Sequence, residues 1–175
     1  MKVKDLMSKN VGCCYPEDSL NRAAQIMWES DCGVVPVMDR ESRVVGMLTD
    51  RDLCMAAYTQ GRPLREISTA LAMSKQVWSC RPEDDLGAAE AMMRAHQVHR
   101  LPVTDEQGRA VGILSLGDVA REAAIQEKAK GRKDIHYADV GRTLGAINEL
   151  RVRAADPVPV SALPKRTREH ATPVQ

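Results

Sequence analysis

The chain contains one sequence unit twice. Residues 7–54 align with residues 73–120 without a gap, and about 19 of the aligned positions are identical. A unit this short is expected to share its core with its copy, which predicts two halves packed together. A ligand of such a pair would lie in the clefts between the copies, where the pseudo-symmetry provides each site twice.

Composition limits the class of protein. A chain of 175 residues is long enough for one domain made of two halves and a tail. Its net charge of +1 argues against nucleic-acid binding by a charged surface, and we interpret the basic stretch 165–168 as part of a solvated tail. The first residues lack the apolar run of a signal peptide, and no apolar stretch approaches the roughly 18 residues of a membrane helix. We therefore expect a cytoplasmic protein without a membrane segment.

The five cysteines form no CxxC pair. Because their number is odd, we expect reduced thiols rather than a disulfide framework. Cys14 and Cys80 occupy equivalent positions in the two copies, and we interpret them as small buried apolar residues.

Both copies predict the same order of elements. A short strand around Val11–Cys14 precedes a helix that Asp18 or Ser19 would cap, and two Val-rich strands with a polar turn follow. Pro36 and its counterpart Pro102 predict edge strands or bulges. A last helix begins after the second of these strands. The pattern predicts an α+β protein with two β-α-β-β-α units.

The repeats suggest a division of the chain. We expect repeat 1 with its linker over residues 1–66, repeat 2 over 67–130 and a C-terminal extension over 131–175. Within the extension, residues 138–150 predict a short helix. The Pro-rich, basic end reads as a flexible tail.

The ordered motifs resemble those of a known family. The series P-E-D-S-L, G-V-V-P-V-M-D and V-G-M-L-T-D-R-D returns as P-E-D-D-L, H-R-L-P-V-T-D and V-G-I-L-S-L-G-D. This series is similar to that of a tandem pair of CBS domains, also called a Bateman module, and the resemblance covers roughly Val3 to Ala124.

The resemblance implies a fold and a function. Such pairs form a disc-like unit with pseudo-two-fold symmetry and often assemble as homodimers. They bind adenosyl ligands such as AMP, ADP, ATP or S-adenosylmethionine, and they regulate an effector protein rather than catalyse a reaction. On this basis we expect a nucleotide sensor with no catalytic residues and an unknown effector.

The strand-to-helix turns provide the first candidate site. The resemblance assigns phosphate contacts to Thr49 and Ser115 and ribose contacts to Asp52 and Asp118, at helix N-termini that favour anions. The same spacing also forms a capping box, in which these side chains satisfy only the donors of their own helix. Both interpretations stay open at this point.

The two copies differ in charge. His99 and Arg100 reach the strand that would border the Ser115 cleft, where copy one has only Gly33 and Val34. Arginine binds phosphate oxygens in a bidentate manner. We hypothesise that the copy-two cleft binds the phosphorylated ligand better, although Arg51 could partly substitute in copy one. The alternative is an exposed arginine beside a half-buried histidine.

The adenine ring needs an apolar slot. The first predicted strand of each copy and the strand before each turn would supply its walls, namely Val11, Cys13, Val77, Ser79, Met47 and Ile113. These residues are equally good candidates for the core.

The sequence gives little support for a metal site or an enzyme and leaves one alternative function open. His96 and His99 suggest zinc only weakly, because one ends a helix and the other begins a strand, so we expect no metal site. Catalysis finds little support, because the cysteines lack a positioned His and Asp partner in any recognisable motif. The serious alternative is a ligand-free module for protein–protein interaction or dimerisation.

Overall fold

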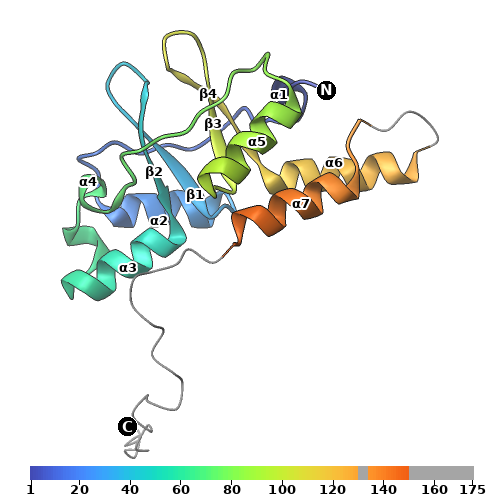
Figure 1. Cartoon of the computed structure of the whole chain (residues 1–175). Coiled ribbons are helices and arrows are strands. Elements are labelled where there is room, and N and C mark those ends of the chain that lie inside the picture. The colour runs from blue at the N-terminus through green and yellow to red at the C-terminus, as the bar shows by residue number, and fades with distance from the viewer. Residues whose placement is uncertain (130–133, 150–175) are drawn as a thin grey trace, which may run out of the picture.

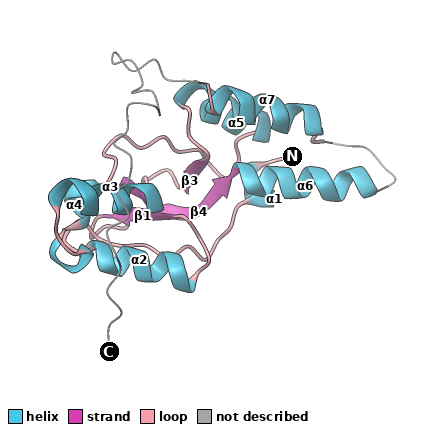
Figure 2. Ribbon diagram, turned by 90° about the horizontal axis from the view of Figure 1, so that it is seen from below, coloured by secondary structure: helices cyan, strands magenta, loops and turns pink. Residues whose placement is uncertain are grey.

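The structure, a computed structural model, describes residues 1–129 and 134–149. Each repeat places an antiparallel hairpin between two helices. Copy one comprises α2 (Leu20–Glu29), β1 (Val34–Met38), β2 (Val44–Thr49) and α3 (Asp50–Gln60), and copy two comprises α5 (Leu86–His96), β3 (Arg100–Thr104), β4 (Ala110–Ser115) and α6 (Leu116–Lys128). A 3₁₀ turn (Leu64–Glu66) lies in the linker, and the other helices are α1 (Val3–Leu6), α4 (Thr69–Ala72) and α7 (Tyr137–Ile147). The strands lie centrally, with α2–α4 on one side and α5–α7 on the other (Figures 1 and 2). The predicted α+β fold with two pseudo-symmetric repeats is confirmed.

The first strand of each repeat is shorter than predicted. Cys14 and Cys80 each form only a single parallel bridge to the hairpin, at Val37 and Val103. The next ladder hydrogen bonds on either side would be donated by proline nitrogens, which carry no hydrogen. These prolines are Pro16 and Pro36 in copy one, and Pro82 and Pro102 in copy two.

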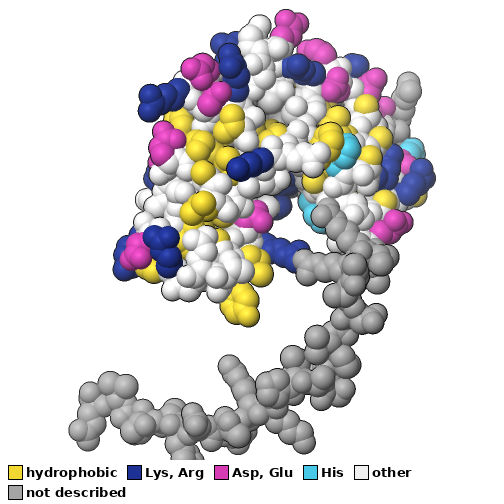
Figure 3. Space-filling model, turned by 60° about the vertical axis from the view of Figure 1, so that its left-hand side comes forward, with side chains coloured by type: hydrophobic (Ala, Val, Ile, Leu, Met, Phe, Trp, Pro, Cys, Tyr) yellow, Lys and Arg dark blue, Asp and Glu magenta, His cyan; other side chains and the backbone are white. Residues whose placement is uncertain are grey.

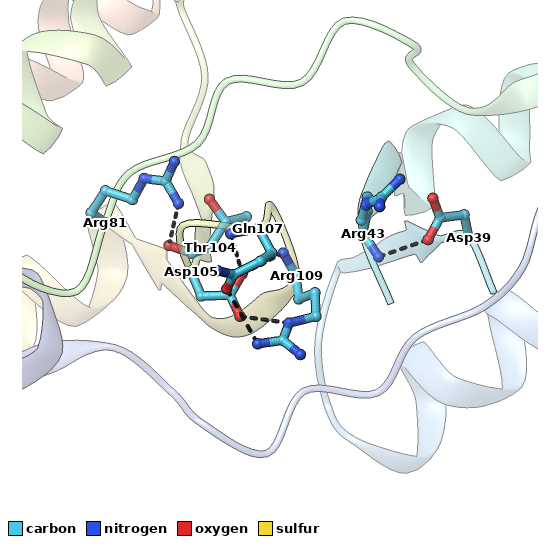
Figure 4. Close-up of polar contacts among 7 residues, drawn as sticks. All are labelled: Asp39, Arg43, Arg81, Thr104, Asp105, Gln107 and Arg109. Carbon is cyan, nitrogen blue, oxygen red and sulfur yellow. Dashed lines mark hydrogen bonds and ion pairs between the residues drawn. The ribbon is translucent and has the colours of Figure 1, made fainter. Parts of the chain in front are cut away.

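Aspartates close the two hairpin turns. Asp39 Oδ1 accepts hydrogen bonds from the backbone N–H of Arg43 at 2.8 Å and of Glu41 at 3.0 Å. Asp105 Oδ1 does the same for Arg109 at 2.9 Å, and its Oδ2 pairs with Arg109 Nε at 2.7 Å (Figure 4). The two turns also meet each other, because Arg43 and Arg109 form an antiparallel bridge. The hairpin tips are therefore one of the places where the copies are joined.

Each copy is completed by a segment that belongs to the other part of the chain. Val3, in α1, is fully buried in the core cluster of copy two, and its N–H donates to Asp84 O at 3.0 Å. Ile67 is fully buried in the cluster of copy one, and its carbonyl accepts from Leu20 N at 2.8 Å. The two cores thus contain exchanged pieces, which joins the repeats into one unit.

Two glycines permit a close approach between the copies. Met47 in β2 and Ser74 exchange backbone hydrogen bonds of 3.1 and 2.9 Å. Ile113 in β4 exchanges two bonds of 2.9 Å with Ser8. A Cβ at Gly112 would lie 2.7 Å from Ser8 O, and one at Gly46 would lie 2.6 Å from Met73 Sδ. Both strands can carry a neighbouring segment only because these side chains are absent.

The helix starts and the C-terminal extension fit the sequence analysis in part. Ser19 is the N-cap of α2 by backbone position, but its side chain makes no capping hydrogen bond. Asp18 Oδ2 accepts instead from Tyr15 N at 2.8 Å, within the preceding turn. The helix predicted over residues 138–150 is present as α7, which packs against α5 and α6. The tail predicted to be flexible lies outside the described residues, beyond residue 149.

Cys14 and Cys80 are buried as predicted, with exposed fractions of 0% and 2%. Burial raises the pKa of each thiol from 9.0 to about 11, so the thiolate is disfavoured in the folded chain. Their contribution to stability is complete below pH 9 and is lost as the pH rises towards 11.

We therefore predict that iodoacetamide at pH 8 modifies the exposed Cys54 in the native protein and leaves Cys14 and Cys80 unmodified. Peptide mass spectrometry after labelling with and without denaturant would measure this difference. Equal labelling of the three thiols in the native protein would contradict the burial of Cys14 and Cys80.

We also predict that Gly112→Ala lowers the free energy of unfolding by roughly 1–3 kcal/mol, because a backbone oxygen of the other copy occupies the Cβ position. Gly46→Ala should cost less, since the nearest atom there belongs to the flexible Met73 side chain and the nearest backbone oxygen, Ser74 O, is farther away at 3.0 Å. Gly87→Ala is the control, because its Cβ would meet nothing within 4 Å. Urea denaturation would measure all three, and equal effects of Gly112→Ala and Gly87→Ala would rule out the close approach.

Candidate functional site

The strand-to-helix turns form capping boxes in both copies. Thr49 Oγ1 and Thr49 N donate to Asp52 Oδ2 at 2.7 and 2.8 Å, and Asp52 N donates back to Thr49 Oγ1 at 3.2 Å. Ser115 and Asp118 repeat the arrangement at 2.6, 2.9 and 3.1 Å. Such a box contributes about 1 kcal/mol to a helix. The capping interpretation therefore describes these residues without a ligand, and it leaves Asp52 Oδ1 outside the box.

A first cavity lies beside the turn of copy one, and we call it the Thr49 cleft. Its volume is about 230 Å³. Copy one contributes the end of its hairpin and the start of α3, and copy two contributes its exchanged segment and the loop before β3. The lining residues are Val34, Met47, Thr49, Asp52, Ser74, Gln76, Trp78, Gln97, Val98, His99 and Arg100.

The second cavity, the Ser115 cleft, is the pseudo-symmetric counterpart. It is larger, with a volume of about 450 Å³. Copy two contributes Arg100, Ile113, Ser115, Gly117, Asp118 and Arg121. Copy one contributes Ser8, Asn10, Val11, Gly12 and residues 30–34. Both clefts thus lie on the seam between the copies, where the repeat predicted them.

The structure brings together only some of the predicted wall residues. Val11 lines the Ser115 cleft, whereas Cys13, Val77 and Ser79 line neither cleft. In copy two the positions of the opposite parity, Gln76 and Trp78, line the cleft, and in copy one the corresponding Asn10 and Gly12 line it together with Val11. Side chains alternate along an extended segment, so a one-residue error in register selects the wrong face.

Trp78 is the most informative residue that the sequence analysis missed. Its indole stacks on His96 with ring centroids 3.4 Å apart and planes 6° from parallel. The aligned residue in copy one is Gly12, where a Cβ would lie 2.5 Å from Ile26 Cγ2. Gly12 and Trp78 differ in size more than any other aligned pair, and this difference was the signal in the sequence that the two clefts are unlike.

His99 and Arg100 lie at the junction of the two clefts. The hairpin register pairs Arg100 with Ser115, as it pairs Val34 with Thr49. The half-buried Arg100 lines both clefts, whereas the exposed His99 lines the Thr49 cleft and not the Ser115 cleft. Arg51 is exposed and lines neither cleft.

The helix N-termini differ in the donors that they leave for a ligand. In α3 the first three N–H groups are all bonded within the protein, to Gly33 O, Asp50 Oδ1 and Thr49 Oγ1. In α6 the first donates to His99 O and the third to Ser115 Oγ. Among the described residues, the second N–H, of Gly117, has no hydrogen-bond partner. Gly117 lines the Ser115 cleft, and a Cβ at this position would approach only Ser115 Oγ, at 3.5 Å.

The N-termini of α3 and α6 also differ in the charged side chains of their first turns. Asp50 and Asp52 place two carboxylates in the first turn of α3, whereas α6 has only Asp118 there, and Arg121 Nη1 pairs with it at 2.9 Å. Over the face drawn in Figure 3, side chains of both signs are interspersed. The two helix N-termini therefore differ in their local charge, although the surface around them is mixed.

Residues 1–129 and 134–149 contain no group of three or more His, Cys, Asp or Glu side chains that could hold a metal. Within those same ranges, the helices are too short or too polar for a transmembrane span.

These features define a class of protein, in which two α+β repeats exchange segments and enclose two clefts of small-molecule size. The chain belongs to the CBS domain family, which matches residues 3–58 and 64–125. It is 36% identical over 131 residues to the CBS domain-containing protein YhcV of Bacillus subtilis, covering 73% of this chain and 89% of YhcV.

Solved structures agree with this membership. CBSX2 in complex with AMP is 28% identical, with a TM-score of 0.63 over 73% of this chain and 98% of CBSX2. The CBS domain pair of protein MJ0100, in complex with 5-methylthioadenosine and S-adenosyl-L-methionine, is 25% identical, with a TM-score of 0.61 over 69% of this chain and 98% of that one. The family resemblance noted from the sequence is thereby confirmed.

Proposed function

We propose that the chain is a regulatory module that binds an adenine nucleotide or related adenosyl ligand in the Ser115 cleft. The observation that carries the proposal is the unpartnered Gly117 N–H at the start of α6, beside Arg100. A helix N-terminus attracts anions through its free N–H groups and its dipole, and a guanidinium adds a charge-assisted hydrogen bond. The AMP and S-adenosylmethionine complexes of related proteins support an adenosyl ligand.

In this proposal the residues of the Ser115 cleft have separate roles. Gly117 N–H, Ser115 and Arg100 bind the phosphate or the equivalent end of the ligand. Asp118 accepts from the ribose hydroxyls, and Val11 and Ile113 pack on the adenine ring. The acidic α3 N-terminus, whose donors are already bonded, makes the Thr49 cleft the weaker site for a phosphate.

Further assignments rest on the same proposal. We infer a cytoplasmic, non-catalytic protein that forms a homodimer and reports its ligand to an effector protein. Trp28 on α2 and Tyr58 on α3 are 88% and 82% exposed, and they are our candidates for these contacts. These exposed side chains also favour the alternative, a ligand-free interaction module.

We predict that at least one of AMP, ADP, ATP and S-adenosylmethionine stabilises the protein by about 2.7 kcal/mol at a hundredfold excess over Kd. Thermal unfolding with each compound at millimolar concentration would measure this. An unchanged unfolding temperature with all four would favour the interaction module.

A charge placed at Gly117 tests the position of the phosphate. We predict that Gly117→Asp keeps α6 intact, because an acidic residue in the first turn suits the helix dipole, and that it weakens AMP binding about tenfold or more. Arg51→Asp adds a carboxylate at the aligned position of copy one and should leave AMP affinity unchanged. Isothermal titration calorimetry would compare the two variants, with circular dichroism as the check on folding. Equal loss in both variants, or loss in Arg51→Asp alone, would exclude the Ser115 cleft as the main site.

A further inference from the structure

The C-terminal helix α7 is attached to copy two by a buried polar contact. Thr143 is fully buried, and its Oγ1 accepts from Arg94 Nη1 at 2.8 Å and donates to Glu90 Oε1 at 3.2 Å. The Glu90 side chain is itself only 6% exposed. Because a buried carboxylate is costly without hydrogen-bond partners, this contact favours one position of α7 on α5.

Both ends of α7 are also fixed. Before the helix, the backbone N–H groups of Asp134 and Ile135 donate to Gln126 Oε1 of α6 at 2.8 and 3.2 Å. At its end, Gln97 Nε2 donates to Glu149 O at 3.1 Å. Ile135 and Ile147 are 3% and 6% exposed and join the copy-two core. In this structure the helix is therefore docked on copy two along its whole length.

The attachment is specific to that copy. Glu90 and Arg94 align with Ala24 and Trp28 of copy one, which offer neither a carboxylate nor a guanidinium. The two side chains that bond Thr143 are therefore present on α5 and have no equivalent on α2. Moreover, α7 lies beyond the residues 3–58 and 64–125 that match the CBS family.

Docking brings α7 to the start of α6. Val140 and Leu144 line a cavity of about 520 Å³ whose other residues are His99, Arg100, Ser115, Leu116, Gly117 and Ala120. We call it the α7 cavity. It shares Arg100, Ser115 and Gly117 with the Ser115 cleft, so the two spaces adjoin at the start of α6. Leu144 remains 46% exposed at its rim, where a bound group would cover it.

We propose that α7 is a further wall of the Ser115 site and that its docking is coupled to ligand binding, an inference that rests on the proposed function. A ligand held by Gly117 N–H and Arg100 also contacts Val140 and Leu144, and it makes those contacts only when α7 is docked. Differential contact of this kind shifts the equilibrium towards the docked state, and the coupling acts equally in both directions. Occupancy of the Ser115 cleft thereby raises the fraction of molecules in which α7 is docked.

Thr143→Val tests the coupling from the side of the helix. The variant removes both side-chain hydrogen bonds to α5 at nearly constant volume. We predict faster amide exchange over residues 137–147 and a Kd for AMP raised at least about fivefold. In the wild type, saturating AMP should slow exchange in the same helix by a comparable factor. Thr59→Val is the control, because that hydroxyl bonds only the backbone of its own helix, at Met55 O and Ala56 O.

Leu144→Glu tests the wall without releasing the helix. Its side chain is at the rim, so α7 exchange should remain as in the wild type, while the added charge beside a phosphate raises the Kd for AMP about tenfold. Leu144→Gln, nearly equal in shape and uncharged, should change the Kd far less. Full-length protein is used throughout, with calorimetry and hydrogen exchange as the two measurements.

The outcomes separate this inference from the proposed function. If AMP binds the wild type, but Thr143→Val and Leu144→Glu both bind it with unchanged affinity, the coupling is wrong and the nucleotide site stands. If AMP, ADP, ATP and S-adenosylmethionine all fail to bind the wild type, both proposals fall. If one of the other three binds in place of AMP, it becomes the probe for the same variants.

Discussion

The reciprocal exchange of segments between the repeats is the constraint on which the rest of the structure depends. Backbone hydrogen bonds join β2 to Ser74 and β4 to Ser8, and they form because Gly46 and Gly112 let the chains approach closely. A two-stranded hairpin alone is marginal in water, so each needs the added segment and the helices for stability. Since each cleft has one wall from a hairpin and another from an exchanged segment, the clefts exist only when the repeats are paired.

The two pseudo-symmetric clefts differ in a few side chains, which change their hydrogen-bond donors and their shape. The capping boxes are the same in both copies, which keeps the two helix starts in equivalent positions. In copy one the Asp50 carboxylate accepts from the second N–H of α3, whereas in copy two the aligned residue of Asp50 is Leu116, which has no carboxylate to accept from the N–H of Gly117. Trp78 places an indole at the wall of the Thr49 cleft, whereas the aligned Gly12, packed closely against Ile26, places no side chain at the wall of the Ser115 cleft. The duplicated fold therefore supplies two positions, and local substitutions make them unequal.

The helix α7 extends this asymmetry beyond the repeats. Its buried Thr143 pairs with Glu90 and Arg94, two residues with no chemical counterpart in copy one. The same packing that covers the core of copy two also brings Val140 and Leu144 to the α7 cavity. The attachment of α7 and the proposed readout of the ligand thus depend on one set of contacts.

The sequence by itself determined the duplication, the helix starts at Thr49 and Ser115, and the burial of Cys14 and Cys80, because these follow from local spacing and residue type. It also contained the prolines that limit each first strand to one bridge. Only the tertiary structure decided which side chains face the clefts, since Gln76 and Trp78 differ from Val77 and Ser79 by a single step of register. The exchange of Val3 and Ile67, the place of His99 and the docking of α7 were likewise decided there. Periodicity shows that a face is buried, but the partner that covers it is chosen by packing between segments distant in the chain.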